Sequence, residues 1–440
     1  MLTVPISSTA KIHRLAIWCT GMLAVTLASC APQRPASTPA VSETLELLHD
    51  EPIRAVFPEV NLRWYACVFA PSGDVWVFGY AQVASGGKWH HRILCSRYDG
   101  ARWSSPEVLW EQVDERPVPD SPWSKVWAVD ATWSQRGPVA LWTLGAVPVE
   151  SKMFQMRRTE DGWSVPELTG ALVSLGGIPP LTTVSTAEGQ AHCVYSGDLV
   201  PEERYLTGIN DGYYPRKPFY MTLSGDTWTT PRPIAGRSRW TYGPYGLAIG
   251  PDGPLHLAAE AHYMSRLSHV GFRVEYRVMR NGKWSTPEYI SDPMGAPRYP
   301  SIAVDRDGKV HLVYTVRHST EGGVRVPAGR YCVRTNEGWS APTEIGRNAF
   351  RPILQDDIEG NVYCFWMESG KYFDEFLMRA WTPDKSIKPL TLKSFPGPSP
   401  RLYQGPRGGV YLTGLERARN RLSPKESAVV IQRFVLKNSE

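Results

Sequence analysis

A short motif built on tryptophan recurs along the chain and constrains its fold more than any other feature. The pattern Trp-Ser/Thr-x-Pro occurs five times, starting at Trp103, Trp163, Trp228, Trp284 and Trp339. Successive tryptophans are 60, 65, 56 and 55 residues apart. Self-similarity at such a period indicates an architecture built from one repeated supersecondary unit. The fold is therefore expected to be a closed or stacked array of similar units.

A glycine that opens a strand of alternating apolar residues is the second landmark, and it recurs seven times. These glycines are Gly73, Gly137, Gly189, Gly253, Gly308, Gly360 and Gly408. Their spacing of 48 to 64 residues fits one four-stranded blade per repeat. The 17 Trp and 20 Tyr favour sheets, and the 38 Gly and 38 Pro separate short strands. The prediction is an all-β fold, a β-propeller of about seven four-stranded blades, with six blades as the alternative.

The clearest repeat spans residues 298–346 and predicts four strands, named A to D, at 298–304, 309–316, 330–335 and 339–345. Strand D carries the proline of the motif. This position suits the outer edge of a blade, where a missing backbone N–H faces solvent without breaking a ladder bond. The tryptophan that precedes it is expected to pack between neighbouring blades, because a large flat apolar side chain fills such a junction.

The last repeat supplies only three strands, within residues 400–437. The segment 42–48 near the start of the chain resembles the outer strand of other repeats, such as 164–168. An open array would leave unpaired strand edges, which proteins avoid. The N-terminal segment is therefore predicted to complete the last blade and close the ring.

The first 30 residues resemble the export signal of a bacterial lipoprotein. Lys11 and Arg14 precede an apolar run at 15–27, which is too short to span a membrane, and Leu27-Ala28-Ser29-Cys30 resembles a lipobox. The predicted domains are a lipoprotein signal peptide (1–29), a lipid-anchored flexible tether (30–43) and a β-propeller domain (44–440). The resemblance implies lipidation at Cys30, membrane attachment through that lipid and an extracytoplasmic place in the cell envelope, at the outer membrane in a Gram-negative cell. The alternative is an ordinary signal peptide with a chance cysteine.

Charge and cysteine content exclude several classes of partner. The net charge is +5, or +3 without Lys11 and Arg14, and the basic residues are scattered, so no nucleic-acid partner is expected. Five cysteines follow Cys30, an odd number with no CxxC spacing. This pattern argues against a disulfide framework or a metal cluster and favours small buried apolar side chains. No cofactor and no metal site is expected.

The turn before the repeated tryptophan reads Gly100-Ala101-Arg102-Trp103 in the first repeat. It resembles a degenerate Asp-box, the structural hairpin of the sialidase-like (BNR-repeat) propeller superfamily, over residues 58–437. Ser96 matches the serine of that box, whereas Tyr98 stands where its aspartate would be. The resemblance implies a propeller and, if activity is kept, a sialidase-type glycosidase with an arginine triad. The Arg-Ile-Pro motif of that family is absent, and Arg63-Trp64-Tyr65 stands near its place.

Candidate site residues lie where strands A begin and strands B end, on one face of a propeller. Four arginines near the start of strand A form a potential ring for a carboxylate, sulfate or phosphate: Arg63, Arg298, Arg351 and Arg401. The alternative is that each arginine pairs within its own blade. Tyr242 offers a flat face to a sugar ring or, equally, packs a blade junction. Glu260 and Glu368 are acid or base candidates, or partners of arginines.

Two functions from different classes compete at this stage. The first is binding of a carbohydrate or other anionic envelope ligand without established catalysis, with sialidase-like glycoside hydrolysis as its catalytic variant. The second is a noncatalytic platform for envelope proteins, with specificity in its long loops. Because the chemical motifs of the resembled family are missing, binding without catalysis is favoured and the enzyme question stays open. Convergence of the arginines around one pocket would favour an anionic ligand.

Overall fold

The computed structural model describes residues 45–114, 126–145, 151–173, 181–198, 216–234, 240–264, 270–290, 292, 295–319, 325–347, 349–368, 375–381, 390–393, 400–417 and 426–438. Within these ranges the chain forms strands and turns, and it has no helix long and apolar enough to cross a membrane. Residues Thr44–Glu440 form one compact unit. The predicted signal peptide, Cys30 and the tether lie outside the described residues.

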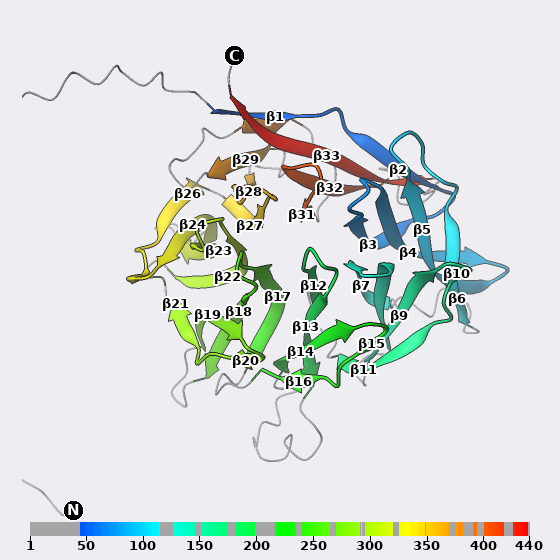
Figure 1. Cartoon of the computed structure of the whole chain (residues 1–440), viewed down its shortest axis with the longest axis horizontal. Coiled ribbons are helices and arrows are strands. Elements are labelled where there is room, and N and C mark those ends of the chain that lie inside the picture. Colours follow the sequence, from blue (N-terminus) through cyan, green and yellow to red (C-terminus); the bar gives the residue numbers. More distant parts are fainter. Residues whose placement is uncertain are drawn as a thin grey trace, which may run out of the picture. The chain divides into compact units, whose positions relative to one another are not determined.

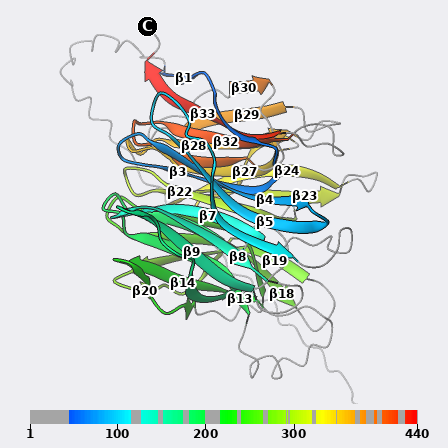
Figure 2. The same cartoon turned by 90° about the vertical axis from the view of Figure 1, so that its right-hand side faces the viewer.

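Seven small antiparallel sheets surround a common centre in this unit (Figure 1). Each sheet is one blade, and in the side view the strands run roughly along the viewing direction of Figure 1 (Figure 2). The fold is therefore a seven-bladed β-propeller, as predicted, and the six-bladed alternative is wrong.

Blades 1 to 3 follow one another along the chain, and each is given with its inner strand first. Blade 1 contains β3 (Leu62–Phe69), β4 (Val75–Ser85), β5 (Lys88–Tyr98) and β6 (Glu107–Asp114). Blade 2 contains β7 (Val126–Ser134), β8 (Gly137–Leu144), β9 (Ser151–Thr159), β10 (Gly162–Trp163) and β11 (Glu167–Val173). Blade 3 contains β12 (Leu181–Ser185), β13 (Ala191–Asp198), β14 (Arg216–Ser224), β15 (Thr227–Trp228) and β16 (Arg232–Pro233).

Blades 4 to 6 repeat the same order. Blade 4 contains β17 (Trp240–Ile249), β18 (Leu255–Met264), β19 (Val270–Arg280), β20 (Lys283–Trp284) and β21 (Glu288–Ile290). Blade 5 contains β22 (Ala296–Val304), β23 (Val310–Ser319), β24 (Arg325–Thr335), β25 (Gly338–Trp339) and β26 (Thr343–Arg347). Blade 6 contains β27 (Ala349–Asp356), β28 (Val362–Glu368), β29 (Glu375–Trp381) and β30 (Leu390–Lys393).

Blade 7 joins the two ends of the unit. It contains β31 (Arg401–Gln404), β32 (Val410–Arg417) and β33 (Glu426–Asn438), and two N-terminal strands pair with the outer side of β33. They are β1 (Leu45–His49), with Leu45 opposite Asn438, and β2 (Ile53–Pro58), with Pro58 opposite Glu426. The predicted closure is thus confirmed, and β2 adds a second closing strand that the sequence analysis missed.

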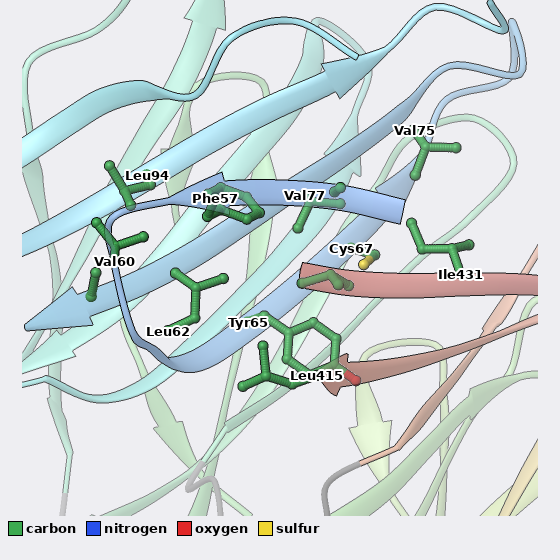
Figure 3. Packing of buried hydrophobic residues seen from close by; sticks show 13 residues of the cluster. Phe57, Val60, Leu62, Tyr65, Cys67, Val75, Val77, Leu94, Leu415 and Ile431 are labelled. Atoms are coloured by element: carbon green, nitrogen blue, oxygen red, sulfur yellow. The ribbon is translucent and has the colours of Figure 1, made fainter. Parts of the chain in front are cut away.

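The closing strand β2 seals the junction between blades 7 and 1 with apolar side chains. Phe57 is fully buried among Leu62, Val77, Leu94 and Ile431 (Figure 3). The side chains of β2 alternate between buried and exposed, so Val56 next to it is 39% exposed. Burying a phenylalanine contributes about 1.5–3 kcal/mol by transfer alone, which stabilises the closure of the ring.

The Ser/Thr of the repeated motif has a backbone-like role. In all five copies its hydroxyl accepts a hydrogen bond from an N–H of the neighbouring strand, at 3.0–3.3 Å. The pairs are Ser104 with Arg97, Ser164 with Arg157, Thr229 with Thr222, Ser285 with Val278 and Ser340 with Val333. In blades 2 to 5 the motif divides the predicted strand D into two short strands, which both pair with the same neighbour. The hydroxyl therefore replaces a ladder carbonyl at this break.

The tryptophan of the motif packs between blades, as predicted. Trp284 of blade 4 meets Tyr220 of blade 3 edge-on, with ring centroids 5.6 Å apart. Trp339 of blade 5 meets Tyr276 of blade 4 in the same way, at 5.1 Å. Such edge-to-face pairs are worth about 0.5–1.5 kcal/mol beyond their burial. These two motifs therefore fix blades 4 and 5 to the blades that precede them.

Three successive blades also share a histidine–tyrosine pair, which joins the second and third strands. The hydrogen-bonded pairs are His192 with Tyr220, His256 with Tyr276, and His311 with Tyr331, at 2.8–2.9 Å. Burial, with Arg280 and Arg334 nearby, lowers the pKa of His256 to about 4. This imidazole is therefore neutral in the folded protein at neutral pH.

Candidate binding site at the channel mouth

A cavity of about 540 Å³ lies at the propeller centre and is lined by the innermost strands of all seven blades. Its size is in the range of sites for small ligands, which is about 300–1,000 Å³. The wall combines arginines, aromatic rings and aliphatic side chains with a few polar groups. These residues lie on the first half of the inner strand in blades 1 and 3, near its middle in blades 2 and 5, and in its second half in blade 4. The cavity therefore includes the strand starts where the sequence analysis placed the candidate arginines.

Three of the four predicted arginines line this one cavity: Arg63, Arg351 and Arg401. Arg298 is not part of its wall. Its Nη1 lies 3.1 Å from Glu260 Oε1, on the neighbouring blade 4. Arg298 pairs instead with Glu260, which matches the alternative that Glu260 is the partner of an arginine.

Arg401 forms an ion pair that spans the channel. Its Nη1 lies 3.1 Å from Asp130 Oδ1, and its Nη2 donates to the Val129 carbonyl at 3.3 Å. Asp130 Oδ2 in turn accepts from the N–H and hydroxyl of Thr183, at 3.0 and 3.1 Å. Blades 7, 2 and 3 are thereby connected. Because Asp130 is only 8% exposed, its charge compensates that of Arg401, and this end of the cavity carries little net charge.

Arg351 has a different setting. Its guanidinium carbon lies 4.7 Å from the centre of the Tyr299 ring and 5.2 Å from that of Phe350. Its Nε is buried without a hydrogen-bond partner, and no acidic side chain pairs with it among the described residues. The attraction of a guanidinium to aromatic faces contributes about 0.5–2 kcal/mol. This is less than the hydration free energy that a cation loses when it is buried. Arg351 thus presents an uncompensated positive charge at the cavity wall.

The backbone at Arg351 and Tyr299 is strained. Both residues have left-handed φ values, +48° and +55°, and both precede a proline. A side chain disfavours this region by about 1–2 kcal/mol, and a following proline favours extended backbone instead. Each residue lies in a bulge of its inner strand, β27 or β22. Bulges redirect side chains, and strain of this kind clusters at ligand sites.

The other predicted residues differ in how they relate to the cavity. Arg63, which lines the cavity, is exposed at its rim beside the half-buried Trp64. Tyr242 lies on β17 opposite Glu260, and its side chain is outside the described part. Tyr245 of the same strand lines the wall but is buried, with its hydroxyl 2.6 Å from Ser196 Oγ. Glu368 ends β28, is half-buried and is not in the wall.

Asp130, Thr183 and Tyr299 are site residues that the sequence analysis missed. Asp130 is the only charged residue of the inner strand β7, which is a signal that can be read from the sequence. Tyr299 and Arg351 each stand nine residues before the glycine of their blade and directly before a proline. The shared offset could have placed Tyr299 beside Arg351.

The chemistry of the wall suits binding better than nucleophilic attack. Burial raises the pKa of Tyr65 and of Tyr403 well above the ordinary value for a phenol. An activated tyrosine nucleophile requires the opposite shift. Among the described residues no three His, Cys, Asp or Glu side chains group as metal ligands. Cys67, Cys95, Cys193, Cys332 and Cys364 are buried, as predicted.

The fold and the cavity define a seven-bladed β-propeller with a charged, aromatic central pocket. No protein-family model and no curated protein matches the chain. A protein of unknown function from Dyadobacter fermentans is similar in fold, with 9% identity, 88% of this chain and 99% of the other covered, and a TM-score of 0.50. The polysaccharide lyase Uly1 is similar at 9% identity, over 81% and 88% of the two chains, with a TM-score of 0.51. The α-L-arabinanase of Penicillium chrysogenum has 10% identity, coverage of 87% and 98%, and a TM-score of 0.43.

Proposed function

We propose that this protein binds an acidic carbohydrate, or a chemically similar anionic envelope polymer, in the cavity at the channel mouth. The observation that carries the proposal is the Arg351 guanidinium, which lines the cavity with no acidic partner among the described residues. A cation held between aromatic rings in a partly dry wall gains most from an anionic ligand that forms charge-assisted hydrogen bonds with it.

The other wall residues suit a sugar that carries one acidic group. Arg63 adds positive charge at the rim, and Trp64 and Tyr299 bring aromatic side chains to the same wall. Flat apolar faces with a few polar groups are typical of ligand pockets. The Arg401–Asp130 pair leaves the inner end nearly neutral, which suits hydroxyl groups rather than a second anion.

The scaffold and the N-terminal sequence add weaker support. The polysaccharide lyase Uly1 has a similar fold. This similarity concerns the scaffold and not the residues of a site. The lipobox-like sequence at Cys30 supports the view that this protein is lipid-anchored and extracytoplasmic in the bacterial envelope, where acidic polymers are present. Catalysis is not part of the proposal, and neither is an envelope-protein partner.

Calorimetric titration of the purified protein with acidic oligosaccharides and their neutral counterparts tests the proposal. Arg351→Ala is expected to weaken binding of the acidic ligands about 10- to 100-fold, since a hydrogen bond to a charged group contributes about 1.5–3 kcal/mol. Arg351→Lys should restore part of the affinity, because it keeps the charge without the planar fork.

Arg92→Ala provides a matched control, because Arg92 pairs with Glu111 on the outer strands of blade 1, away from the cavity wall. This variant should bind like the wild type. Equal affinity of the wild-type protein for acidic and neutral ligands, or of Arg351→Ala and wild type for the acidic ones, would refute the proposal. Release of new reducing ends during the titration would instead reveal cleavage of glycosidic bonds.

A further inference from the structure

We infer that Glu260, which lies outside the cavity wall, is a positioning residue that sets the anion affinity of Arg351 through Tyr299. This inference rests on the proposed function and goes beyond it, because it assigns control of the pocket to a neighbouring blade.

Glu260 is a buried carboxylate at the junction of blades 4 and 5. It lies on β18 and its side chain is only 2% exposed. Oε1 is 3.1 Å from Arg298 Nη1, and Oε2 accepts a hydrogen bond from the Tyr299 N–H at 3.4 Å. A buried carboxylate is costly unless its oxygens have such partners. The two contacts therefore anchor consecutive residues of β22 to β18.

The anchored residues are those that enter the strained bulge of β22. The bulge lies between Arg298 and Ser301, and Tyr299 within it has a φ of +55°. Without an acceptor for its N–H, Tyr299 would favour the extended backbone that precedes most prolines. A charged acceptor is stronger than a neutral one and so stabilises the unusual conformation. Glu260 thus determines where the Tyr299 side chain points.

The Tyr299 ring in turn holds the anion-binding group of the next blade. It lies under the Arg351 guanidinium and packs edge-on against Phe350, with centroids 5.7 Å apart. Arg351 is itself fixed at its N–H, which donates to Thr315 Oγ1 at 3.0 Å. A long side chain that is already ordered loses less entropy when a ligand binds. Displacement of the ring would free the guanidinium and lower the affinity.

Binding measurements on Glu260 variants test this chain of contacts. Glu260→Ala is expected to weaken binding of an acidic oligosaccharide about 5- to 20-fold, the range in which positioning and preorganisation usually act. Glu260→Gln keeps an oxygen acceptor for the Tyr299 N–H and should retain most of the affinity. Glu288→Ala is the matched control, because Glu288 of blade 4 also pairs with an arginine of blade 5, Arg334, but lies on the outer strand β21 and not in the wall. It should bind like the wild type.

A double-mutant comparison separates positioning from general loss of structure. In the Arg351→Ala background, Glu260→Ala is expected to cause no further loss of affinity, because both changes remove the same interaction. The same fold loss in both backgrounds would overturn the inference, as would wild-type affinity of folded Glu260→Ala. If the wild-type protein binds no acidic oligosaccharide at all, the proposed function fails instead.

Labelling with phenylglyoxal, an arginine reagent, provides a readout that needs no ligand. Arg351 should be modified several-fold faster in Glu260→Ala than in the wild type, because its Nε and guanidinium lose the Tyr299 cover. Arg92 should react equally in both proteins. Equal labelling of Arg351 in the two proteins would contradict the positioning role even if the ligand is still unidentified.

Discussion

The repeated turns at the outer strands and the starts of the inner strands obey different rules. All five Trp-Ser/Thr-x-Pro turns share a hydroxyl that completes the ladder, and in blades 2 to 5 the tryptophan contacts the preceding blade. The inner strands differ from blade to blade, with Asp130 in one, Tyr299 in another and Arg351 in a third. The repeat therefore builds the ring, and the departures from it build the pocket.

This difference gives each region its own measurable quantity. Changes in the repeated contacts or the closing strands should lower the free energy of unfolding and leave the affinity of the folded protein unchanged. Changes at the inner strands should lower the ligand affinity and leave the free energy of unfolding nearly unchanged, because strained and unpaired groups there contribute little to stability.

The largest stability effect is expected at the ring closure. Phe57→Ala should lower the free energy of unfolding by about 3–5 kcal/mol, because it empties the sealed junction of blades 7 and 1. Urea unfolding followed by tryptophan fluorescence measures the loss. Val56→Ala, on the exposed side of the same strand, should stay within about 0.5 kcal/mol of the wild type. Similar losses for the two variants would show that β2 does not seal the ring.

A smaller change in the free energy of unfolding is expected when the pH is lowered, because His256 titrates. The folded pKa of His256 is about 4, below its unfolded value near 6.5, so the unfolded chain binds the proton first. Stability present above pH 6.5 is therefore lost as the pH falls toward 4. At pH 5 the loss from this group is about 2 kcal/mol. His256→Gln should reduce the difference in urea midpoint between pH 7 and pH 5, whereas His49→Gln, on an exposed position, should not.

The motif hydroxyl should contribute less again. Ser285→Ala is expected to cost about 1 kcal/mol, because the Val278 N–H loses its acceptor. Ser285→Thr should be tolerated, since Thr229 fills the same role in blade 3. Thr286→Ala, at the exposed position beside it, serves as control. A loss for Ser285→Thr equal to that for Ser285→Ala would contradict the backbone-like role of the hydroxyl.

The smallest effect on the free energy of unfolding is expected at the pocket, where the effect on ligand binding should be large. Arg351→Gly should leave the free energy of unfolding unchanged or raise it by up to about 1 kcal/mol, because glycine accepts a φ of +48° without strain. Binding of acidic ligands should be lost in the same variant. A drop in stability of about 2 kcal/mol or more would show that Arg351 is part of the framework.

The sequence predicts the periodic part of this protein well. The spacing of the glycines gives seven blades, and the missing last strand gives the closure. Three of the arginines line one cavity because residues at similar positions along the inner strands of different blades lie at a similar height along the channel. Each of these conclusions depends on a repeat, and a repeat can be read without coordinates.

The non-periodic part could not be predicted in the same way. Equivalent bulges in β22 and β27 place Tyr299 and Arg351, nine residues before their glycines, in the cavity wall, whereas Arg298 is ten residues before its glycine and lies outside it. Arg401 and Asp130 are 271 residues apart, and they meet only because the ring places blades 7 and 2 across the channel. Long-range pairs of unlike residues leave no local pattern.

The pairing of both ends of the chain on β33 also has a consequence for biosynthesis. The ribosome makes β1 and β2 first, but their partner strand is made last, so these segments wait while about six blades emerge. Until the C-terminal strand arrives, the nascent protein exposes the apolar face of Phe57 and an unpaired edge. A truncated product therefore cannot hide these surfaces, and loss of the last strand alone should mark the whole protein for degradation.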